Sequence, residues 1–319
     1  MPSIQTPLGA LPARFRLSRL LIVGCGDIGL RVAGLLAHKL SVRALTSTPA
    51  RLPALRAAGI TPLLGNLDHA STLRRLAGVA PRVLHLAPPA GQGARDGRTL
   101  ALLRALRLRA APAALVYMST SGVYGDCAGA WVDEVRALAP STARAHRRVD
   151  AEAHVRFLGR TLRVRTSVLR VPGIYAPKRE GGTPLARLRN GTPVLEAADD
   201  VYTNHIHADD LARACVLALW RGKAQRAYNI NDDAALKMGD YFTAAAALYG
   251  LPVPPRISRA QAEQQISAMQ LSFMSESRRM VNTRMKRELG LRLQFPHVLD
   301  GLAAAPQVLD APAAVPRGR

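Results

Sequence analysis

Residues 19–29 read RLLIVGCGDIG, and the fold prediction starts from this stretch. Its first five residues form a short apolar run typical of a buried strand, and residues 27–40 (DIGLRVAGLLAHKL) have the amphipathic pattern of a helix. Between the two, Gly24, Gly26 and Gly29 form a G-x-G-x-x-G motif. In this context Gly24 permits a tight turn, Gly26 lets a pyrophosphate approach the backbone, and Gly29 allows close packing of helix on strand.

The motif predicts a dinucleotide site formed by the loop residues Gly24, Cys25, Gly26, Asp27, Ile28 and Gly29. The helix that begins in this loop would turn its amino end toward the phosphates. The alternative is a strand–helix turn that is rich in glycine and binds nothing.

Further strand-like segments follow along the chain, at 41–46, 60–66, 82–88, 114–121, 161–175 and 227–232. They read as short apolar runs separated by helix-like stretches, which is typical of a parallel sheet buried on both faces. Pro62 indicates an edge position, or the start of its strand, because proline donates no ladder hydrogen bond. The predicted fold class is therefore α/β, with a doubly wound parallel sheet.

The chain divides into a sheet domain and a smaller lobe. We expect a dinucleotide-binding domain of the Rossmann type over 19–175, with its sheet completed by 205–232. Residues 176–204 and 233–300 would form a C-terminal substrate lobe that caps the sheet, and 255–290 reads as mostly helical with a break. Residues 1–18 are expected to be a loose arm and 301–319 a tail.

Composition narrows the class of partner. The 319 residues are 48% hydrophobic and 21% charged, which excludes a wholly disordered chain. Lys plus Arg number 44 against 22 for Asp plus Glu, a net charge of +22. The arginines are dispersed and aromatics make up only 4%, which argues against a nucleic-acid footprint and for compositional bias. A basic chain still suits anionic ligands, including phosphorylated cofactors.

The three cysteines, Cys25, Cys127 and Cys215, show neither pairing nor metal-type spacing, which suits a reducing compartment. No apolar run approaches the roughly 20 residues of a membrane helix, and the first residues lack the pattern of a secretory signal. We therefore expect a cytoplasmic protein without a membrane partner.

The end of the second strand bears on the choice between NAD and NADP. An acidic residue there would bind the ribose 2′-hydroxyl of NAD. This chain has Thr46, Ser47 and Thr48 followed by Arg51, and no Asp or Glu occurs between Asp27 and Asp68. Hydroxyls and a guanidinium suit a 2′-phosphate better, so we expect NADP rather than NAD. The alternative is that Arg51 is a solvated helix residue.

Later motifs identify a family resemblance. MSTSGVYG (118–125), RVPGIYAP (170–177) and IHADDLA (206–212) resemble, in order and spacing, three signature segments of extended short-chain dehydrogenases/reductases. This superfamily includes epimerases, dehydratases and reductases that use NAD(P). The resemblance implies that Asn66 and Leu67 contact the adenine, and that Leu86, Ala87 and Pro88 contact the cofactor after the fourth strand. Because homodimers are common in this superfamily, the resemblance also implies a homodimer.

The chain departs from that family at the acid/base pair. The family's Tyr-x-x-x-Lys is followed four residues later by a Glu, which Glu152 matches, so the Lys position is Arg148 and the Tyr position is Arg144. No tyrosine occurs between Tyr124 and Tyr175. An arginine is not a general acid or base near neutral pH, although Arg148 can serve as a fixed charge on the nicotinamide ribose. The resemblance is thus to an atypical subgroup.

The resemblance suggests Thr120, Tyr124 and Arg148 as catalytic candidates. Thr120 matches the family's catalytic Ser/Thr, and Tyr124 could supply a phenol from the neighbouring loop. The alternatives are a hydroxyl bonded to the strand end for Thr120 and packing against the loop for Tyr124.

The substrate is a small molecule that the sequence does not name. Thr203 stands where sugar-nucleotide enzymes of the family commonly carry an Arg, which weakens that assignment. Ser275, Ser277, Arg278 and Arg279 could reach an anionic substrate from the cap, or could simply start a solvated helix. His205 and His207 would share a face, but no further ligand lies near them in sequence, so we expect no metal site.

Three functional hypotheses remain. The first is an NADP-dependent oxidoreductase or epimerase-like enzyme with other acid/base groups. The second is a catalytically silent NADP-binding sensor or interaction module, which the missing tyrosine favours. The third, a nucleic-acid-associated protein, rests on net charge alone.

Overall fold

The computed structural model describes residues 18–304, so the predicted arm, apart from residue 18, and most of the predicted tail lie outside the described residues. Its centre is a seven-stranded sheet in the order β12-β7-β5-β4-β1-β2-β3, and every neighbouring pair is parallel. The strands are β1 (Arg19–Val23), β2 (Ser41–Thr46), β3 (Thr61–Leu64), β4 (Arg82–His85), β5 (Ala114–Thr120), β7 (Arg165–Val171) and β12 (Arg226–Asn229). The predicted doubly wound α/β fold is confirmed.

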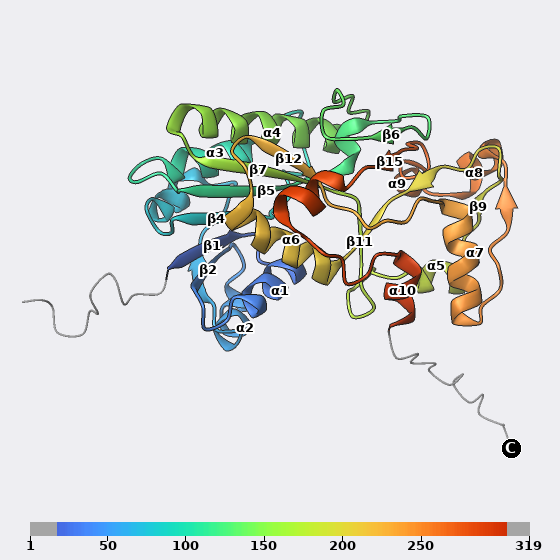
Figure 1. Cartoon of the computed structure of the whole chain (residues 1–319), viewed down its shortest axis with the longest axis horizontal. Helices are drawn as coiled ribbons and strands as arrows, with labels where there is room; N and C mark the ends of the chain where they lie inside the picture. Colours follow the sequence, from blue (N-terminus) through green and yellow to red (C-terminus); the bar gives the residue numbers. More distant parts are fainter. Residues whose placement is uncertain (1–17, 305–319) are drawn as a thin grey trace, which may run out of the picture.

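Helices cover both faces of the sheet (Figure 1). On one face lie α1 (Asp27–Leu35), α2 (Leu52–Ala57) and α6 (Ala208–Arg221), whose Val32, Leu55 and Leu211 share a core with the strands. On the other lie the 3₁₀ segment Ala70–Leu76, α3 (Gly97–Leu106) and α4 (Ala143–Leu162), which contribute Leu73, Leu102 and Val155 to a second core. Burial on both faces explains why the strand sequences show apolar runs rather than alternation.

The edge of the sheet follows the proline signal. Strand β3 pairs with β2 alone, and Pro62 lies opposite Ala44. The missing N–H of Pro62 therefore costs no central ladder bond, and its predicted edge position is confirmed.

The predicted strand 161–175 divides into three parts. Helix α4 runs to Leu162, and Arg163 then takes a left-handed conformation with φ 54° that ends it. Strand β7 stays in the sheet, whereas β8 (Gly173–Tyr175) pairs with β11 (His205–His207) in a separate two-stranded sheet. Pro172 lies at the break and has no N–H to continue the ladder. Only β12 of the predicted 205–232 segment joins the main sheet.

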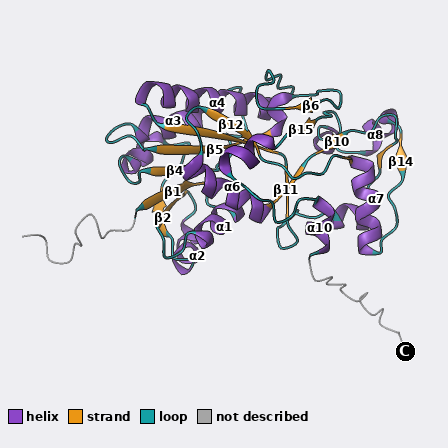
Figure 2. Ribbon diagram, in the orientation of Figure 1, coloured by secondary structure: helices purple, strands orange, loops and turns teal. Residues whose placement is uncertain are grey.

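A second lobe packs beyond the carboxyl ends of the strands (Figures 1 and 2). It contains α5 (Leu185–Arg189), α7 (Met238–Tyr249), α8 (Arg259–Gln265), α9 (Ala268–Leu271) and α10 (Val298–Ala303), joined by the short strands β9 (Val194–Leu195), β10 (Tyr202–Thr203), β13 (Leu236–Lys237) and β14 (Arg256–Ile257). Its own core includes Val194, Phe242 and Leu302. Because Leu302 is buried, the folded chain extends past the predicted boundary at 300.

The prediction of mostly helix over 255–290 is wrong for much of that segment. Strand β15 (Arg279–Met280) pairs with β6 (Trp131–Val132), and only a short π-helical turn, Met285–Leu289, follows. None of the helices in residues 18–304 is long and apolar enough to cross a membrane.

Candidate functional site

The glycine loop joins β1 to α1 with geometry that only glycine tolerates at its first position. Gly24 has φ +85°, and a Cβ there would lie 2.4 Å from the backbone nitrogen of Ala87. A Cβ on Gly29 would lie 3.3 Å from Cγ2 of Ile22 on β1, so this glycine permits the close packing of helix on strand. The tight turn and the close packing expected of these two glycines are both present.

Gly26 differs because a Cβ there would meet nothing within 4 Å. It is the N-cap residue of α1 and gives the helix no side-chain cap, so it leaves the amides of the first turn without a capping acceptor. That is the arrangement a pyrophosphate requires. The neighbouring Cys25 thiol is buried, which raises its pKa to about 11 and keeps it protonated.

The segment after β2 brings Arg51 to the glycine loop. Arg51 ends the 3₁₀ turn Pro49–Arg51, and its Nη2 donates to the carbonyl of Cys25 at 2.7 Å. The amide of Thr48 donates to Thr46 Oγ1 at 3.3 Å, while Ser47 and Thr48 are exposed. The structure thus places Arg51 and these hydroxyls beside the predicted dinucleotide loop.

The segments after β3 and β4 lie at the same edge of the sheet. Asn66 uses its side chain to accept the amide of Asp68 at 3.0 Å, and Leu67 is buried. The amides of Leu86 and Ala87 donate to the carbonyl of Val23 at 2.8 and 3.0 Å. These bonds attach the chain after β4 to the start of the glycine loop.

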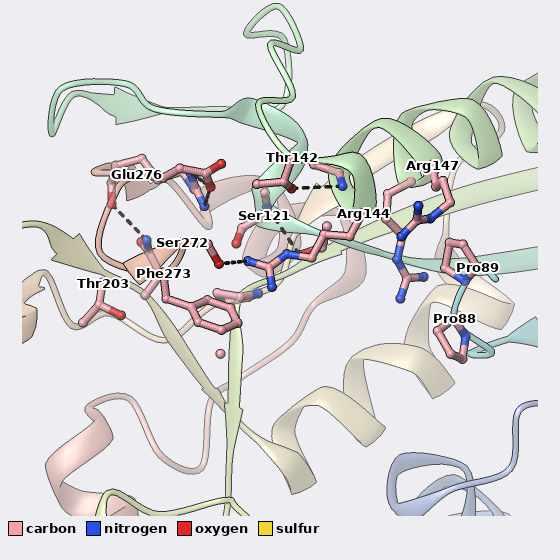
Figure 3. A pocket seen from close by; sticks show the side chains of 18 of the residues that line it. Pro88, Pro89, Ser121, Thr142, Arg144, Arg147, Thr203, Ser272, Phe273 and Glu276 are labelled. Carbon is pink, nitrogen blue, oxygen red and sulfur yellow. Dashed lines mark hydrogen bonds and ion pairs between the residues drawn. The ribbon is translucent and has the colours of Figure 1, made fainter. Parts of the chain in front are cut away.

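A cavity of about 460 Å³ continues from that point (Figure 3). Its volume is within the range of small-molecule sites. Its walls come from the segment after β4, the end of β5, the start of α4 and the second lobe, and they include Pro88, Thr120, Ser121, Arg144, Arg147, Arg148, Tyr202, Thr203, Phe273, Glu276 and Arg278. Of the predicted site residues, the structure brings together Pro88, Thr120 and Arg148 here.

The side chains of Thr120 and Arg148 differ in how firmly hydrogen bonds hold them at the cavity. Thr120 is partly buried, and its hydroxyl accepts the amide of Gly122 at a long 3.4 Å, so part of the strand-end alternative is present. Arg148 is held firmly, because its Nη1 donates to the carbonyl of Met118 at 2.8 Å and to the hydroxyl of Tyr117 at 3.1 Å.

Tyr124 is not among the cavity-lining residues. Its side chain is buried and its hydroxyl donates to Asn229 Oδ1 at 2.7 Å, while Arg170 Nη1 donates to the hydroxyl oxygen of Tyr124 at 2.9 Å. Arg170 also pairs with Glu152 at 2.9 Å. Burial raises the pKa of Tyr124 to about 12. This geometry favours packing for Tyr124, and the matched Glu152 belongs to the same buried cluster.

Arginines dominate the cavity wall, and two residues of this wall, Arg147 and Phe273, were not predicted from the sequence. Arg147 donates to the carbonyl of Gly93 at 2.8 Å, but its buried Nε has no partner among the described residues. Arg144 lies 4.2 Å over the Phe273 ring and donates to Ser272 at 3.2 Å (Figure 3). Arg144, Arg147 and Arg148 lie on one face of α4 because they are three and four residues apart. No sequence pattern indicated that Phe273 would line the cavity.

Of the four cap residues considered from the sequence, only Arg278 lines the cavity. It is paired with Glu276, at 2.9 Å from both terminal nitrogens. Arg279 lies over Trp131 and Tyr202, Ser277 accepts the amide of Tyr202, and Ser275 donates to the carbonyl of Ser272. The other three therefore support the lobe rather than the cavity.

His205 and His207 are both buried on β11. His207 Nδ1 accepts the amide of Asp209 and caps α6. Within residues 18–304, no group of three or more His, Cys, Asp or Glu side chains is arranged to hold a metal ion.

Comparisons with known proteins agree with this architecture. A model of the NAD-dependent epimerase/dehydratase family matches residues 21–231. A functionally unknown conserved protein from Silicibacter pomeroyi is 31% identical, with a TM-score of 0.76 over 90% of this chain and 97% of that one.

More distant structures show the fold alone. A putative epimerase from Burkholderia cenocepacia is 21% identical (TM-score 0.71, 91% of this chain and 99% of that one). A UDP-glucose 4-epimerase from Thermotoga maritima, solved with UDP-glucose, is 18% identical (TM-score 0.72, 89% and 96%). No curated protein matches the chain.

Proposed function

This chain belongs to the NAD-dependent epimerase/dehydratase family, and from that premise we propose that it is an NADP-dependent oxidoreductase or epimerase-like enzyme acting on an anionic small molecule. One observation carries the proposal. The lining of the cavity of about 460 Å³ includes Pro88, which directly follows the Ala87 packed against Gly24 of the glycine loop, and it also includes Thr120 and Arg148. A dinucleotide on the loop could therefore present its reactive end to the cavity.

The residues at the loop suit a dinucleotide. Residues 24–29 would hold the pyrophosphate, since Gly26 leaves the amino end of α1 open. Asn66 and Leu67 would contact the adenine, and Leu86 to Pro88 the nicotinamide half. When bound, the nicotinamide would give or accept a hydride. Arg148, fixed by Met118 and Tyr117, would supply a charge for the nicotinamide ribose.

The choice of NADP over NAD rests on the segment after β2. Arg51 lies beside the loop, bonded to Cys25. Ser47 and Thr48 are exposed next to it. These donors suit a 2′-phosphate, whereas NAD would be expected to find an acidic partner for its 2′-hydroxyl.

The charge of the cavity supports an anionic substrate. Arg278 is neutralised by Glu276, the only acidic residue that lines the cavity within residues 18–304. Arg144, Arg147 and Arg148 form no ion pair with any residue in 18–304, so the cavity carries uncompensated positive charge. A carboxylate or phosphate on the substrate would compensate this positive charge.

The enzyme hypothesis requires a residue that transfers a proton to or from the substrate. Arginine stays protonated at neutral pH, so neither Arg144 nor Arg148 would move a proton. In this proposal Tyr124 has a structural role, and Thr120 orients a substrate oxygen. Among the described residues, Tyr202 is the one tyrosine that lines the cavity, and it is the residue we propose for proton transfer. A silent NADP-binding module is the second candidate, favoured by Arg144 at the family's tyrosine position.

The test is a titration of cofactor-stripped protein with NADPH and NADH, followed by fluorescence. We expect selective NADPH binding, and we expect Arg51→Gln to remove most of that selectivity. Failure of both dinucleotides to bind at millimolar concentration would overturn the proposal. If NADPH binds, hydride exchange with a panel of carboxylates and phosphate esters distinguishes the two candidates. An enzyme would show exchange that is lost in Tyr202→Phe, whereas a silent module would show none.

Two further parts of the proposal have their own tests. The thiols of Cys25, Cys127 and Cys215 are buried and unpaired, which supports a reducing, cytoplasmic location; localisation of a tagged full chain tests it. A homodimer is proposed from the family, and light scattering of the purified chain tests it.

A further inference from the structure

The first turn of α1 carries a carboxylate where the proposed phosphates would bind. Asp27 directly follows Gly26, the open position of the loop. Its Oδ1 accepts from Arg31 Nε at 3.0 Å and its Oδ2 accepts from Arg179 Nη1 at 2.9 Å. A negative side chain suits a helix amino end, but it would repel a neighbouring pyrophosphate unless positive charge accompanies it.

The two arginines differ in the number of carboxylates that they contact. Arg31 is on the same helix and is also bonded to Asp209 on α6, so two carboxylates hold it. Arg179 comes from 152 residues further along the chain and has only Asp27 as its ion-pair partner among the described residues. Since a guanidinium has five N–H donors, Arg179 keeps donors for a second acceptor.

The loop that carries Arg179 is a built structure. It lies between β8 and α5, in the second lobe. The amide of Ala176 donates to the carbonyl of Gly182 at 3.0 Å, and the amide of Gly182 donates to the carbonyl of Arg179 at 2.9 Å. A Cβ on Gly182 would lie 2.5 Å from the carbonyl oxygen of Ala176, so the closure requires glycine there. The loop thereby presents Arg179 toward the glycine loop of the other domain.

We propose that Arg179 is a pyrophosphate-binding residue supplied by the second lobe, which pairs with Asp27 in the free protein and extends its donors to the phosphates when the dinucleotide binds. The inference rests on the proposed function, since it concerns the same cofactor site. Its consequence is that the bound cofactor would add a second contact between the two parts of the chain and would slow the opening of residues 176–182.

The experiment compares Arg179→Gln with Lys178→Gln, because Lys178 is exposed on the same loop and gives a matched loss of charge. We expect NADPH to bind Arg179→Gln about tenfold more weakly, with a shallower salt dependence, and Lys178→Gln within about twofold of the natural chain. Amide hydrogen exchange of residues 176–182 should slow on NADPH addition in the natural chain and in Lys178→Gln, but not in Arg179→Gln.

Asp27→Asn separates phosphate binding from a purely structural ion pair. If Arg179 binds phosphate, Asp27→Asn keeps or strengthens NADPH binding, because a repelling charge is removed. If the pair only holds the loop in place, Asp27→Asn weakens binding as Arg179→Gln does, and the inference is wrong. Equal NADPH affinity of Arg179→Gln and the natural chain would also overturn it. Absence of NADPH and NADH binding to the natural chain would instead overturn the proposed function itself.

Discussion

The glycine loop and the arginine-lined cavity are neighbours in space but are built in opposite ways. The loop comes from residues 24–29, adjacent in sequence, and its shape depends on backbone conformation at Gly24 and on room at Gly26. The cavity combines the end of β5 and the start of α4 with residues of the second lobe that include Phe273 and Arg278. The proposed cofactor site therefore depends on a local backbone motif. The proposed substrate site depends on tertiary packing and on charge.

The largest expected effect comes from the buried cluster under the cavity. Arg170→Met should destabilise the fold by about 3–4 kcal/mol, because it leaves Glu152 as a buried charge whose remaining ion-pair partner, Arg156, lies 3.9 Å away. Tyr124→Phe should cost only about 1 kcal/mol and leave NADPH binding unchanged, since it removes one hydrogen-bonded hydroxyl. Denaturant unfolding and NADPH titration measure both. Loss of NADPH binding in Tyr124→Phe at unchanged stability would restore Tyr124 as a functional residue.

The junction of sheet and second lobe should respond to pH. Burial raises the pKa of Asp232 to about 8, and its Oδ2 has no hydrogen-bond partner among the described residues. An acid with a raised folded-state pKa binds its proton more tightly in the folded chain. Its stabilisation is therefore present at low pH and is lost as pH rises from about 4 toward 8.

We expect stability to fall by roughly 2–4 kcal/mol from this group between pH 5 and 8, and Asp232→Asn to remove most of that fall. Unfolding curves at several pH values measure it. The same decline in the natural chain and in Asp232→Asn would show that this carboxyl is not responsible.

Within the loop, two alanine substitutions should behave differently. Gly24→Ala should destabilise the chain by about 2–3 kcal/mol, because of its positive φ and the collision with Ala87. Gly26→Ala should leave stability within about 0.5 kcal/mol, since its Cβ meets no atom, yet it should weaken NADPH binding by filling the phosphate space. Thermal unfolding and NADPH titration check the pair. Undiminished NADPH binding by Gly26→Ala would place the dinucleotide elsewhere.

The smallest expected effect concerns the cavity. Arg147→Gln should weaken binding of inorganic phosphate to NADPH-saturated protein about tenfold, because a buried guanidinium loses its charge. Arg160→Gln, an exposed arginine near the end of the same helix, is the control. Calorimetry measures both. Equal weakening in the two variants would show that net charge, rather than the cavity, attracts the anion.

The sequence was sufficient where local patterns determine structure. The apolar runs and the glycine motif predicted the parallel sheet and the loop, and Pro62 predicted an edge strand. The sequence was not sufficient where the structure depends on pairing between distant segments. Residues 279–280 form a strand only because residues 131–132 lie beside them, and Pro172 separates β7 from β8, which pairs with β11. For the same reason Phe273 and Arg179 were missed, since only the folded chain shows what they contact.

The central claim is that one dinucleotide links the two regions, with its pyrophosphate at Gly26 and its nicotinamide at the arginine-lined cavity. A crystal structure of the chain grown with NADPH tests this most directly. We predict the phosphates against the amino end of α1, the 2′-phosphate at Arg51 and the nicotinamide between Pro88 and Thr120. A dinucleotide whose nicotinamide lies away from the cavity, or which binds outside the glycine loop, would contradict the account.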